Sequence, residues 1–136
     1  MKKYVLDASI ILTFLLGEKT TFHKKIGLLL KKTSFGKAKL YSSYLLPLEI
    51  GNGLRFSLRD EKLAEKALEK SLNLPIELIG FSLAQYNKIL RLSYSCRTSF
   101  YDASYHFLAM IHGAEFLTAD KKYFRKAKEL GNIELL

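Results

Sequence analysis

The chain has 136 residues and a formal net charge of +9, and its 49% hydrophobic and 26% charged residues are ordinary for a globular protein. This length fits a single domain, residues 1–136, and no apolar run reaches the roughly 18–20 residues that a membrane span needs. The only cysteine, Cys96, excludes an internal disulfide and a cysteine zinc cluster.

Short apolar strands alternate along the chain with segments whose apolar residues recur at helical spacing. In chain order we predict a strand at 2–6, helices at 9–16 and 22–33, a strand at 38–43, helices at 44–59 and 61–72, a strand at 76–80, helices at 82–97 and 99–113, a strand at 115–118, a helix at 120–130 and a strand at 132–136. Ser42 or Ser43 is expected to cap helix 44–59, and Asp60 the next helix. The alternation predicts a three-layer α/β/α sandwich around a mainly parallel sheet.

The N-terminal segment resembles a signal peptide only in part. Lys2 and Lys3 precede an apolar run, but Asp7 interrupts that run and no small-x-small cleavage site follows. We therefore interpret the segment as the first strand and helix, and we expect a cytoplasmic protein that does not associate with membranes.

Four acidic residues each stand alone in a mostly apolar stretch: Asp7, Glu49, Asp102 and Asp120. Burying an ionised carboxylate is costly unless a cation or strong hydrogen bonds compensate it. In a sheet of this type, functional groups gather beyond the carboxyl ends of the strands, where Asp7 and Asp120 are predicted to lie. If the fold brings all four acids together, they form an oxygen-rich site for Mg²⁺ or Mn²⁺.

Each acid also has a purely structural explanation when it is taken alone. Asp7, Asp102 and Asp120 fall at predicted helix starts, where aspartate is favoured as a cap and by the helix dipole. Ser99 and Asp102 have the spacing of a capping box. Glu49 suits a surface position on an amphipathic helix. The metal hypothesis therefore depends on the four acids acting together.

Other polar and basic side chains near the acids are candidates for supporting roles. Three lie within three residues of an acid: Ser9 and Thr118 are suited to bond a metal-bound water or a phosphate, and Asn52 to orient Glu49. Weaker candidates for contact with a substrate are Arg55, Tyr101, Tyr105, Lys121 and Lys122. The lysine-rich stretches at 24–39 and 121–128 would attract phosphate backbones, although a solvated basic surface explains each stretch equally well.

Taken in order, four short motifs resemble those of PIN-domain ribonucleases, and the chain is most similar to the toxins of VapBC-type toxin–antitoxin pairs. The motifs are Asp7-Ala-Ser9, Glu49-Ile-Gly-Asn52, Tyr101-Asp102-Ala103 and Leu117-Thr118-Ala-Asp120. None is specific by itself, but their order and spacing extend over essentially the whole chain. The resemblance implies a central parallel sheet of about five strands with helices on both sides. It also implies Mg²⁺- or Mn²⁺-dependent endonucleolytic cleavage of RNA.

The same resemblance assigns the four acids as metal ligands and catalytic groups, with Ser9 and Thr118 in support. Many family members have a further acid shortly after the position of Asp120, where this chain has Lys121 and Lys122. That difference favours one bound metal over two. The partners that the resemblance implies are an RNA substrate, a cognate antitoxin and a second copy of the chain in a homodimer.

Other functions stay open on the sequence alone. One is a PIN nuclease of RNA processing or DNA repair outside any toxin system, and another is a PIN-like module that binds RNA or protein without cutting. A receiver-like signalling domain is disfavoured because Asp7 is not part of an acidic pair after the first strand. For an antitoxin, the expected docking groove is an exposed apolar surface around Phe14, Leu15 and Leu54.

Overall fold

Five short strands pair in parallel to form a single sheet in this computed structural model, which describes residues 1–17 and 21–136. The strands are β1 (Lys2–Leu6), β2 (Ala38–Ser43), β3 (Glu77–Ile79), β4 (Glu115–Thr118) and β5 (Ile133–Leu135). Their order across the sheet is β3-β2-β1-β4-β5, so the first strand lies in the middle. The predicted parallel sheet of about five strands is confirmed.

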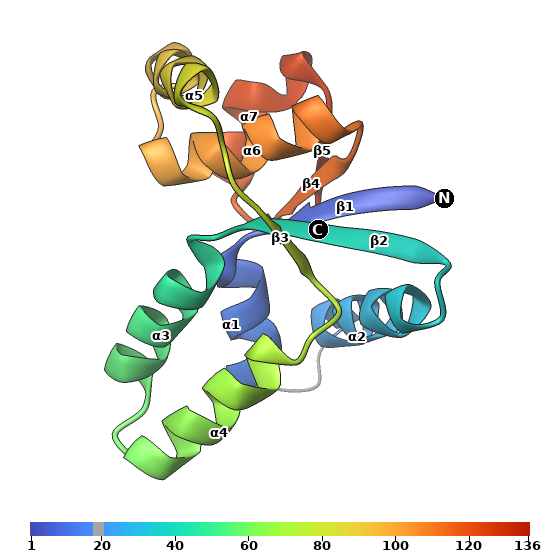
Figure 1. The fold of residues 1–136 in the computed structure, drawn as a ribbon, viewed down its shortest axis with the longest axis vertical. Coiled ribbons are helices and arrows are strands. Elements are labelled where there is room, and N and C mark those ends of the chain that lie inside the picture. The colour runs from blue at the N-terminus through green and yellow to red at the C-terminus, as the bar shows by residue number, and fades with distance from the viewer. Residues whose placement is uncertain (18–20) are drawn as a thin grey trace.

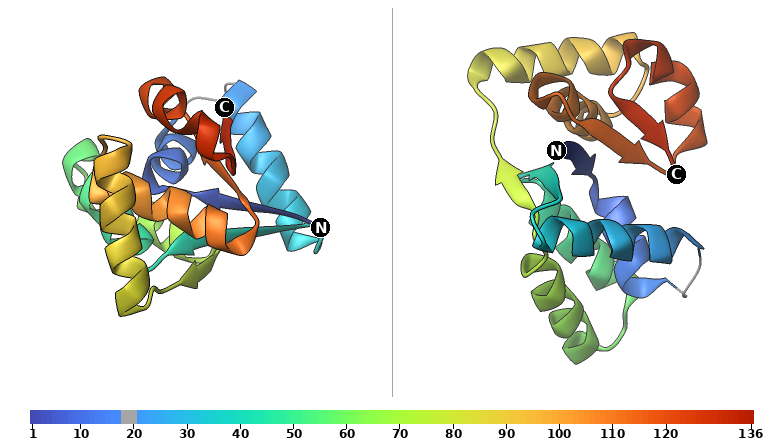
Figure 2. Two further views of the ribbon diagram at one scale, coloured as in Figure 1. Left: turned by 90° about the horizontal axis from the view of Figure 1, so that it is seen from above. Right: turned by 90° about the vertical axis from the view of Figure 1, so that its right-hand side faces the viewer.

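Helices cover both faces of this sheet, as Figures 1 and 2 show. On one face lie α1 (Ala8–Leu16), α2 (Thr21–Ser34), α3 (Leu46–Ser57) and α4 (Glu61–Leu72). On the other lie α5 (Leu83–Ser95), α6 (Phe100–His112) and α7 (Lys121–Ala127), which a 3-10 turn (Lys128–Leu130) extends. The predicted three-layer α/β/α sandwich is therefore correct. Within the described residues, no helix is long and apolar enough to cross a membrane.

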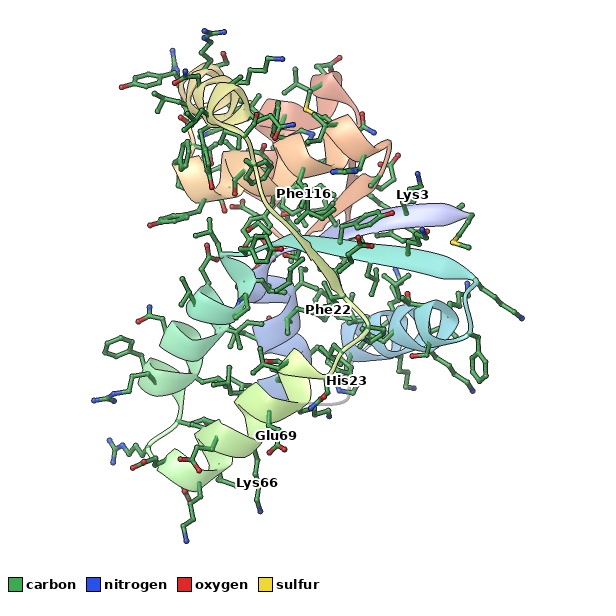
Figure 3. All side chains as sticks on the ribbon, viewed as in Figure 1. Lys3, Phe22, His23, Lys66, Glu69 and Phe116 are labelled. Carbon is green, nitrogen blue, oxygen red and sulfur yellow. The ribbon has the colours of Figure 1, made fainter. Side chains whose placement is uncertain are left out.

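Two apolar layers form because successive side chains of a strand point to opposite faces of the sheet. Leu6 and Leu117 pack into the core beneath α1 and α3, whereas Val5 and Phe116 pack into the core beneath α6. Figure 3 shows Phe116 on the side of α6, with Phe22 on the opposite side of the sheet. Because both faces are covered at the centre of the sheet, consecutive residues of β1 and β4 there are apolar and buried.

The element boundaries lie within about two residues of the sequence prediction at nearly every end, and the start of α3 is a difference with a clear cause. This helix begins at Leu46, and its N-cap residue is Leu45, which makes no side-chain cap hydrogen bond. The two serines that were expected to cap it have other partners. The Ser42 hydroxyl donates to the Leu6 carbonyl (2.7 Å) and ties β2 to β1, while the Ser43 hydroxyl accepts from the Leu45 N–H (3.2 Å).

The strand order creates a switch point at the carboxyl ends of β1 and β4. The chain leaves β1 towards β2 and β3 on one side, then crosses to β4 and β5 on the other side of β1. Connections therefore diverge from the carboxyl ends of β1 and β4, which are adjacent strands. In open α/β sheets, a crevice that holds ligands forms at this type of position.

Candidate metal centre

All four acids that the sequence singled out line one pocket of about 200 Å³ at the switch point. They come from four separate parts of the chain and share the pocket with these other side chains: Ser9, Tyr105, Phe116, Thr118 and Tyr123. Their convergence distinguishes the four acids from ordinary helix caps, because capping alone does not require the capped helix ends to meet.

Asp7 follows β1 directly and caps α1. One carboxylate oxygen, Oδ1, accepts hydrogen bonds from the Ser9 hydroxyl (2.7 Å) and from the Ile10 N–H (3.0 Å). The residue is only 9% exposed. Burial raises the pKa of this carboxyl, the two hydrogen bonds lower it in part, and the nearby Asp102 carboxylate raises it further. Asp7 is therefore a buried acid that hydrogen bonds hold at Oδ1.

Asp102 lies in the first turn of α6, and Asp120 caps α7. The Ser99 hydroxyl accepts from the Asp102 N–H (3.0 Å), but the Asp102 carboxylate accepts from the Thr98 hydroxyl (3.3 Å), so the expected capping box is only half formed. Asp120 accepts from the Tyr123 N–H at 2.9 Å. Both carboxylates remain on the pocket wall while the helix ends that carry them are satisfied.

Glu49 enters the pocket from the first turn of α3 and lacks the cap role of the other acids. Its Oε1 atom is buried and has no hydrogen-bond partner in the described residues, and the same holds for the hydroxyl of Tyr105. Burial raises the pKa of Glu49, the adjacent Tyr105 hydroxyl lowers it, and the charges of Asp7 and Asp102 raise it. The two atoms are therefore close neighbours without a well-formed hydrogen bond between them, which leaves both able to bond a ligand in the pocket.

Tyr123 connects the pocket to a buried histidine on α6. The ring of His106 is fully buried, with Nε2 2.8 Å from the Gly131 carbonyl oxygen and Nδ1 2.7 Å from the Tyr123 hydroxyl. A carbonyl can only accept, so Nε2 carries the proton and Nδ1 accepts from Tyr123. Burial lowers the pKa of His106, which favours this neutral form. The contact between the Tyr123 hydroxyl and His106 fixes α7 against α6. The Tyr123 N–H also donates to the Asp120 carboxylate at the start of α7.

The donor set fits a hard divalent cation. The pocket offers four carboxylates and the hydroxyls of Ser9 and Thr118, and one of the carboxylates, that of Glu49, has a buried oxygen without a partner; oxygen ligands of this type are those that Mg²⁺ and Mn²⁺ prefer. Across residues 1–17 and 21–136, no three His, Cys, Asp or Glu side chains are close enough together to hold an ion as they stand. Binding would therefore require the carboxylates to turn inwards, and like charges oppose that movement until a cation is present.

Five other predicted residues lie outside this pocket. Four of them are exposed side chains that do not line it: Asn52, Tyr101, Lys121 and Lys122. Arg55 is also exposed and lines a separate groove between α3 and α4. The site therefore contains Ser9 and Thr118 as predicted, but not Asn52. The predicted exposed docking surface around Phe14, Leu15 and Leu54 was wrong, because Phe14 and Leu54 are 9% and 2% exposed and belong to the core, and Leu15 is half-buried against it.

Sequence reasoning missed Tyr123 altogether and gave Tyr105 only a weak role. Both are aromatic residues inside apolar helical patterns, where a core position is the natural prediction. For Tyr123, the one available signal was its position three residues after Asp120, which brings its N–H to that acid.

The sequence matches the model of one protein family, the PIN domain, over residues 4–130. The chain belongs to the PIN domain family. PIN domains are generally nucleases and generally use divalent metal ions. No curated protein shows significant similarity to the chain.

Solved structures with the same fold include PAE2754 from Pyrobaculum aerophilum, with 22% identity and a TM-score of 0.67, where the match covers 98% of this chain and 90% of that one. VapBC2 from Rickettsia felis, bound to a DNA fragment from its promoter, has 18% identity and a TM-score of 0.70, with 98% and 97% covered. FitAcB from Neisseria gonorrhoeae has 18% identity and a TM-score of 0.68, with 98% and 96% covered. Identities this low support the fold alone.

Proposed function

We propose that this PIN domain is an Mg²⁺- or Mn²⁺-dependent endoribonuclease that hydrolyses RNA phosphodiester bonds in the pocket at the switch point. The observation that carries the proposal is the convergence of four isolated acids, from four parts of the chain, on one pocket that also contains an orphaned carboxylate oxygen. Hydrolysis of a phosphodiester needs an activated water and a counter-charge for the developing anion. Four carboxylates without a cation would repel a phosphate, so the arrangement favours a metal-dependent reaction.

Asp7, Glu49, Asp102 and Asp120 are the residues that would hold the ion. A bound divalent ion would supply acidification of a water molecule and stabilisation of negative charge on the phosphate. The protein contributes orientation, since Ser9 and the Ile10 N–H fix Asp7. Lys121 and Lys122 follow Asp120 where many family members have another acid, which favours one resident ion over two.

Tyr105 has a distinct part in this proposal. Burial raises the pKa of its hydroxyl, and the charges of Glu49 and Asp7 raise it further, so the group keeps its proton throughout the neutral range. A buried hydroxyl that stays protonated acts as a hydrogen-bond donor. It is suited to orient Glu49 or a group that enters the pocket.

Within this function, the chain is most simply the toxin of a VapBC-type pair, acting in the cytoplasm as a homodimer and held inactive by a cognate antitoxin. The shared fold with VapBC2 and FitAcB favours this assignment. The alternative is a PIN nuclease of RNA processing or repair. An adjacent upstream gene encoding a small DNA-binding protein that co-purifies with the chain would favour the toxin, and the lack of any such gene would favour the alternative.

The direct test is cleavage of a mixed-sequence RNA by wild-type protein and by Asp7→Asn in Mg²⁺, in Mn²⁺ and in EDTA. We expect metal-dependent cleavage by the wild type and a loss on the order of 10²–10³-fold in the variant, as when a transition-state contact is removed. Glu65→Gln makes the same acid-to-amide change at an exposed position of α4 and should cleave normally. Equal cleavage by wild type and Asp7→Asn, or cleavage that survives EDTA, would overturn the mechanism.

A further inference from the structure

A second concave surface lies between α2 and strands β1, β4 and β5, on the face of the sheet that α1–α4 cover. Its volume is about 280 Å³. We call it the lysine groove, because four of its lining side chains are lysines: Lys2, Lys25, Lys32 and Lys37. The right-hand view of Figure 2 shows α2 passing below the N-terminal end of β1 and the C-terminal end of the chain. None of these four lysines lines the acidic pocket.

Local structure brings the four lysines together. Lys25 and Lys32 are seven residues apart on α2, about two helical turns, so they share one face of the helix. After α2 the chain reverses at Gly36, which has a φ of 71° that favours glycine. The Lys37 N–H then donates to the Lys32 carbonyl at 2.8 Å. Lys2 arrives from β1, where it lies opposite Ala38, the residue after Lys37.

The positive charge of this groove exceeds the negative charge that lines it. Glu134 is the one acidic side chain among the lining residues, against four ammonium groups. In the part of the chain that the structure describes, none of the four lysine side chains makes an ion pair or hydrogen bond. The fold does not use these charges internally, which leaves them available for an anionic ligand.

The remaining lining and the surroundings suit a nucleic acid better than a small anion. The floor is largely apolar and includes Leu29 and Leu117. The ring of Phe35, in the turn between Lys32 and Lys37, is 70% exposed, and an exposed aromatic face next to lysines can stack on an unpaired base. Repeated point charges beside stacking surfaces are the usual design of single-strand binding sites.

The groove and the acidic pocket meet β4 from opposite faces of the sheet. Leu117 lines the groove and the next residue, Thr118, lines the pocket, because consecutive strand residues face opposite sides of the sheet. The sheet therefore separates the two sites, and the groove is a surface distinct from the pocket.

We infer that the lysine groove binds the phosphate backbone of single-stranded RNA, at a surface separate from the acidic pocket. Any link to cleavage rests on the proposed nuclease function, whereas binding of RNA by the groove does not. The groove would add affinity for RNA and would leave the chemistry of the bond unchanged.

The test measures binding of a labelled single-stranded RNA in EDTA, where cleavage is absent, over a range of salt concentrations. The test variant is Lys25→Gln with Lys32→Gln. The matched control is Lys62→Gln with Lys66→Gln, which removes the same charge from exposed positions of α4; Figure 3 shows Lys66 far from the N-terminal end of β1 that Lys3 marks. Each lost phosphate contact should reduce the slope of log K against log salt concentration by about 0.7 for a single strand, so the slope for the test variant should be smaller by about 1.4. At 0.1 M salt this corresponds to an affinity about 25-fold lower than that of the wild type.

The control should bind like the wild type. Equal binding by the test variant and the wild type would overturn the inference, as would lysine-dependent binding to anionic vesicles with no binding to RNA. Cleavage in Mg²⁺ separates this inference from the proposed function. A wild type that binds RNA through the lysines but cleaves none would sustain the groove and refute the nuclease. A wild type that cleaves, with a test variant that binds unchanged, would sustain the nuclease and refute the groove.

Discussion

Burial of the charged Asp7 carboxylate destabilises the folded state at neutral pH, because its hydrogen bonds compensate only part of the desolvation cost. A pKa raised above the ordinary value of 3.8 means that the folded state favours the protonated carboxyl. Its contribution to stability is therefore complete below pH 3.8 and is lost as the pH rises through the folded pKa. A residue that weakens the metal-free fold at neutral pH, while lining a pocket with three other acids, fits a role in ligand binding.

Asp7→Asn should therefore make the metal-free protein more stable at pH 7. Asparagine can still cap α1 and accept from Ser9 and the Ile10 N–H, but it carries no charge to desolvate. A gain on the order of 1 kcal/mol would raise Tm by roughly 3–5 °C for a chain of this size. Thermal unfolding in EDTA measures it, and the gain should shrink as the pH falls towards 4. A variant less stable than the wild type at pH 7 would contradict this account.

The second residue-scale prediction concerns the orphaned hydroxyl of Tyr105. Tyr105→Phe removes a buried hydroxyl that lies close to Glu49 but makes no hydrogen bond of good geometry, so stability should change little. Cleavage should drop about tenfold, the worth of one hydrogen bond to a charged group. Tyr105 lowers the pKa of Glu49, so its removal should also move the acid limb of the pH–rate profile to higher pH. Tyr41→Phe is the control, a buried tyrosine outside the pocket; an unchanged profile in Tyr105→Phe would exclude the role.

The candidate site was partly visible in the sequence because charge is conspicuous among apolar residues. Asp7, Glu49, Asp102 and Asp120 interrupt hydrophobic stretches, and the structure brings all four to one pocket. Tyr105 carries no such signal, since an aromatic residue in an apolar helix is usually core. The exposed basic residues were ambiguous for the opposite reason, because a charge on the surface needs no explanation.

At the scale of elements, the boundaries were predictable wherever a local signal fixed them. β2, α4 and β4 begin and end where the sequence predicts, since Asp60 caps α4 and turn residues flank the strands. The start of α3 was not predictable. Ser42 is an ordinary capping residue by type, but its hydroxyl bonds to the Leu6 carbonyl of the neighbouring strand, a long-range contact that sequence spacing does not encode.

Asp60→Ala tests the cap of α4. The Asp60 carboxylate accepts from the Lys62 N–H at 2.9 Å and from the Leu63 N–H at 3.3 Å, and alanine removes both bonds. We expect a loss of about 1 kcal/mol, with unchanged cleavage because α4 does not line the acidic pocket. Asp60→Asn keeps the cap and should match the wild type. Chemical denaturation measures the difference, and a loss of cleavage in Asp60→Ala would show that α4 affects the site.

For the whole molecule, strand–helix alternation predicts a parallel sandwich but leaves the strand order undetermined. The order β3-β2-β1-β4-β5 depends on which helices bury which face, and this order is what places the ends of β1 and β4 together. The sequence could therefore nominate Asp7 and Asp120 as acids after strands. Only the three-dimensional arrangement shows that those strands are adjacent and that Glu49 and Asp102 reach the same edge.

Metal binding should stabilise the whole molecule, and it should do so in a pH-dependent way. An ion that binds only the folded state adds RT ln(1 + [L]/Kd), about 2.7 kcal/mol at 100 times Kd. Protons compete for the same carboxylates, and burial raises the pKa values of Asp7 and Glu49 above 3.8 and 4.5. Stabilisation by Mn²⁺ should therefore be greater at pH 7 than at pH 5, since it is lost as the pH falls through these raised values.

The measurement is the shift in Tm on titration with Mn²⁺ at the two pH values, for wild type, Asp7→Asn and Glu65→Gln. Glu65→Gln alters an exposed acid of α4 and should show the wild-type shift. Asp7→Asn, although more stable without metal, should gain little from Mn²⁺, so that the two proteins converge in Tm as the metal concentration rises. An equal shift in all three proteins would mean that Mn²⁺ acts elsewhere on the surface. A shift confined to proteins with Asp7 would tie the energetic cost of burying this acid directly to the ion that the pocket binds.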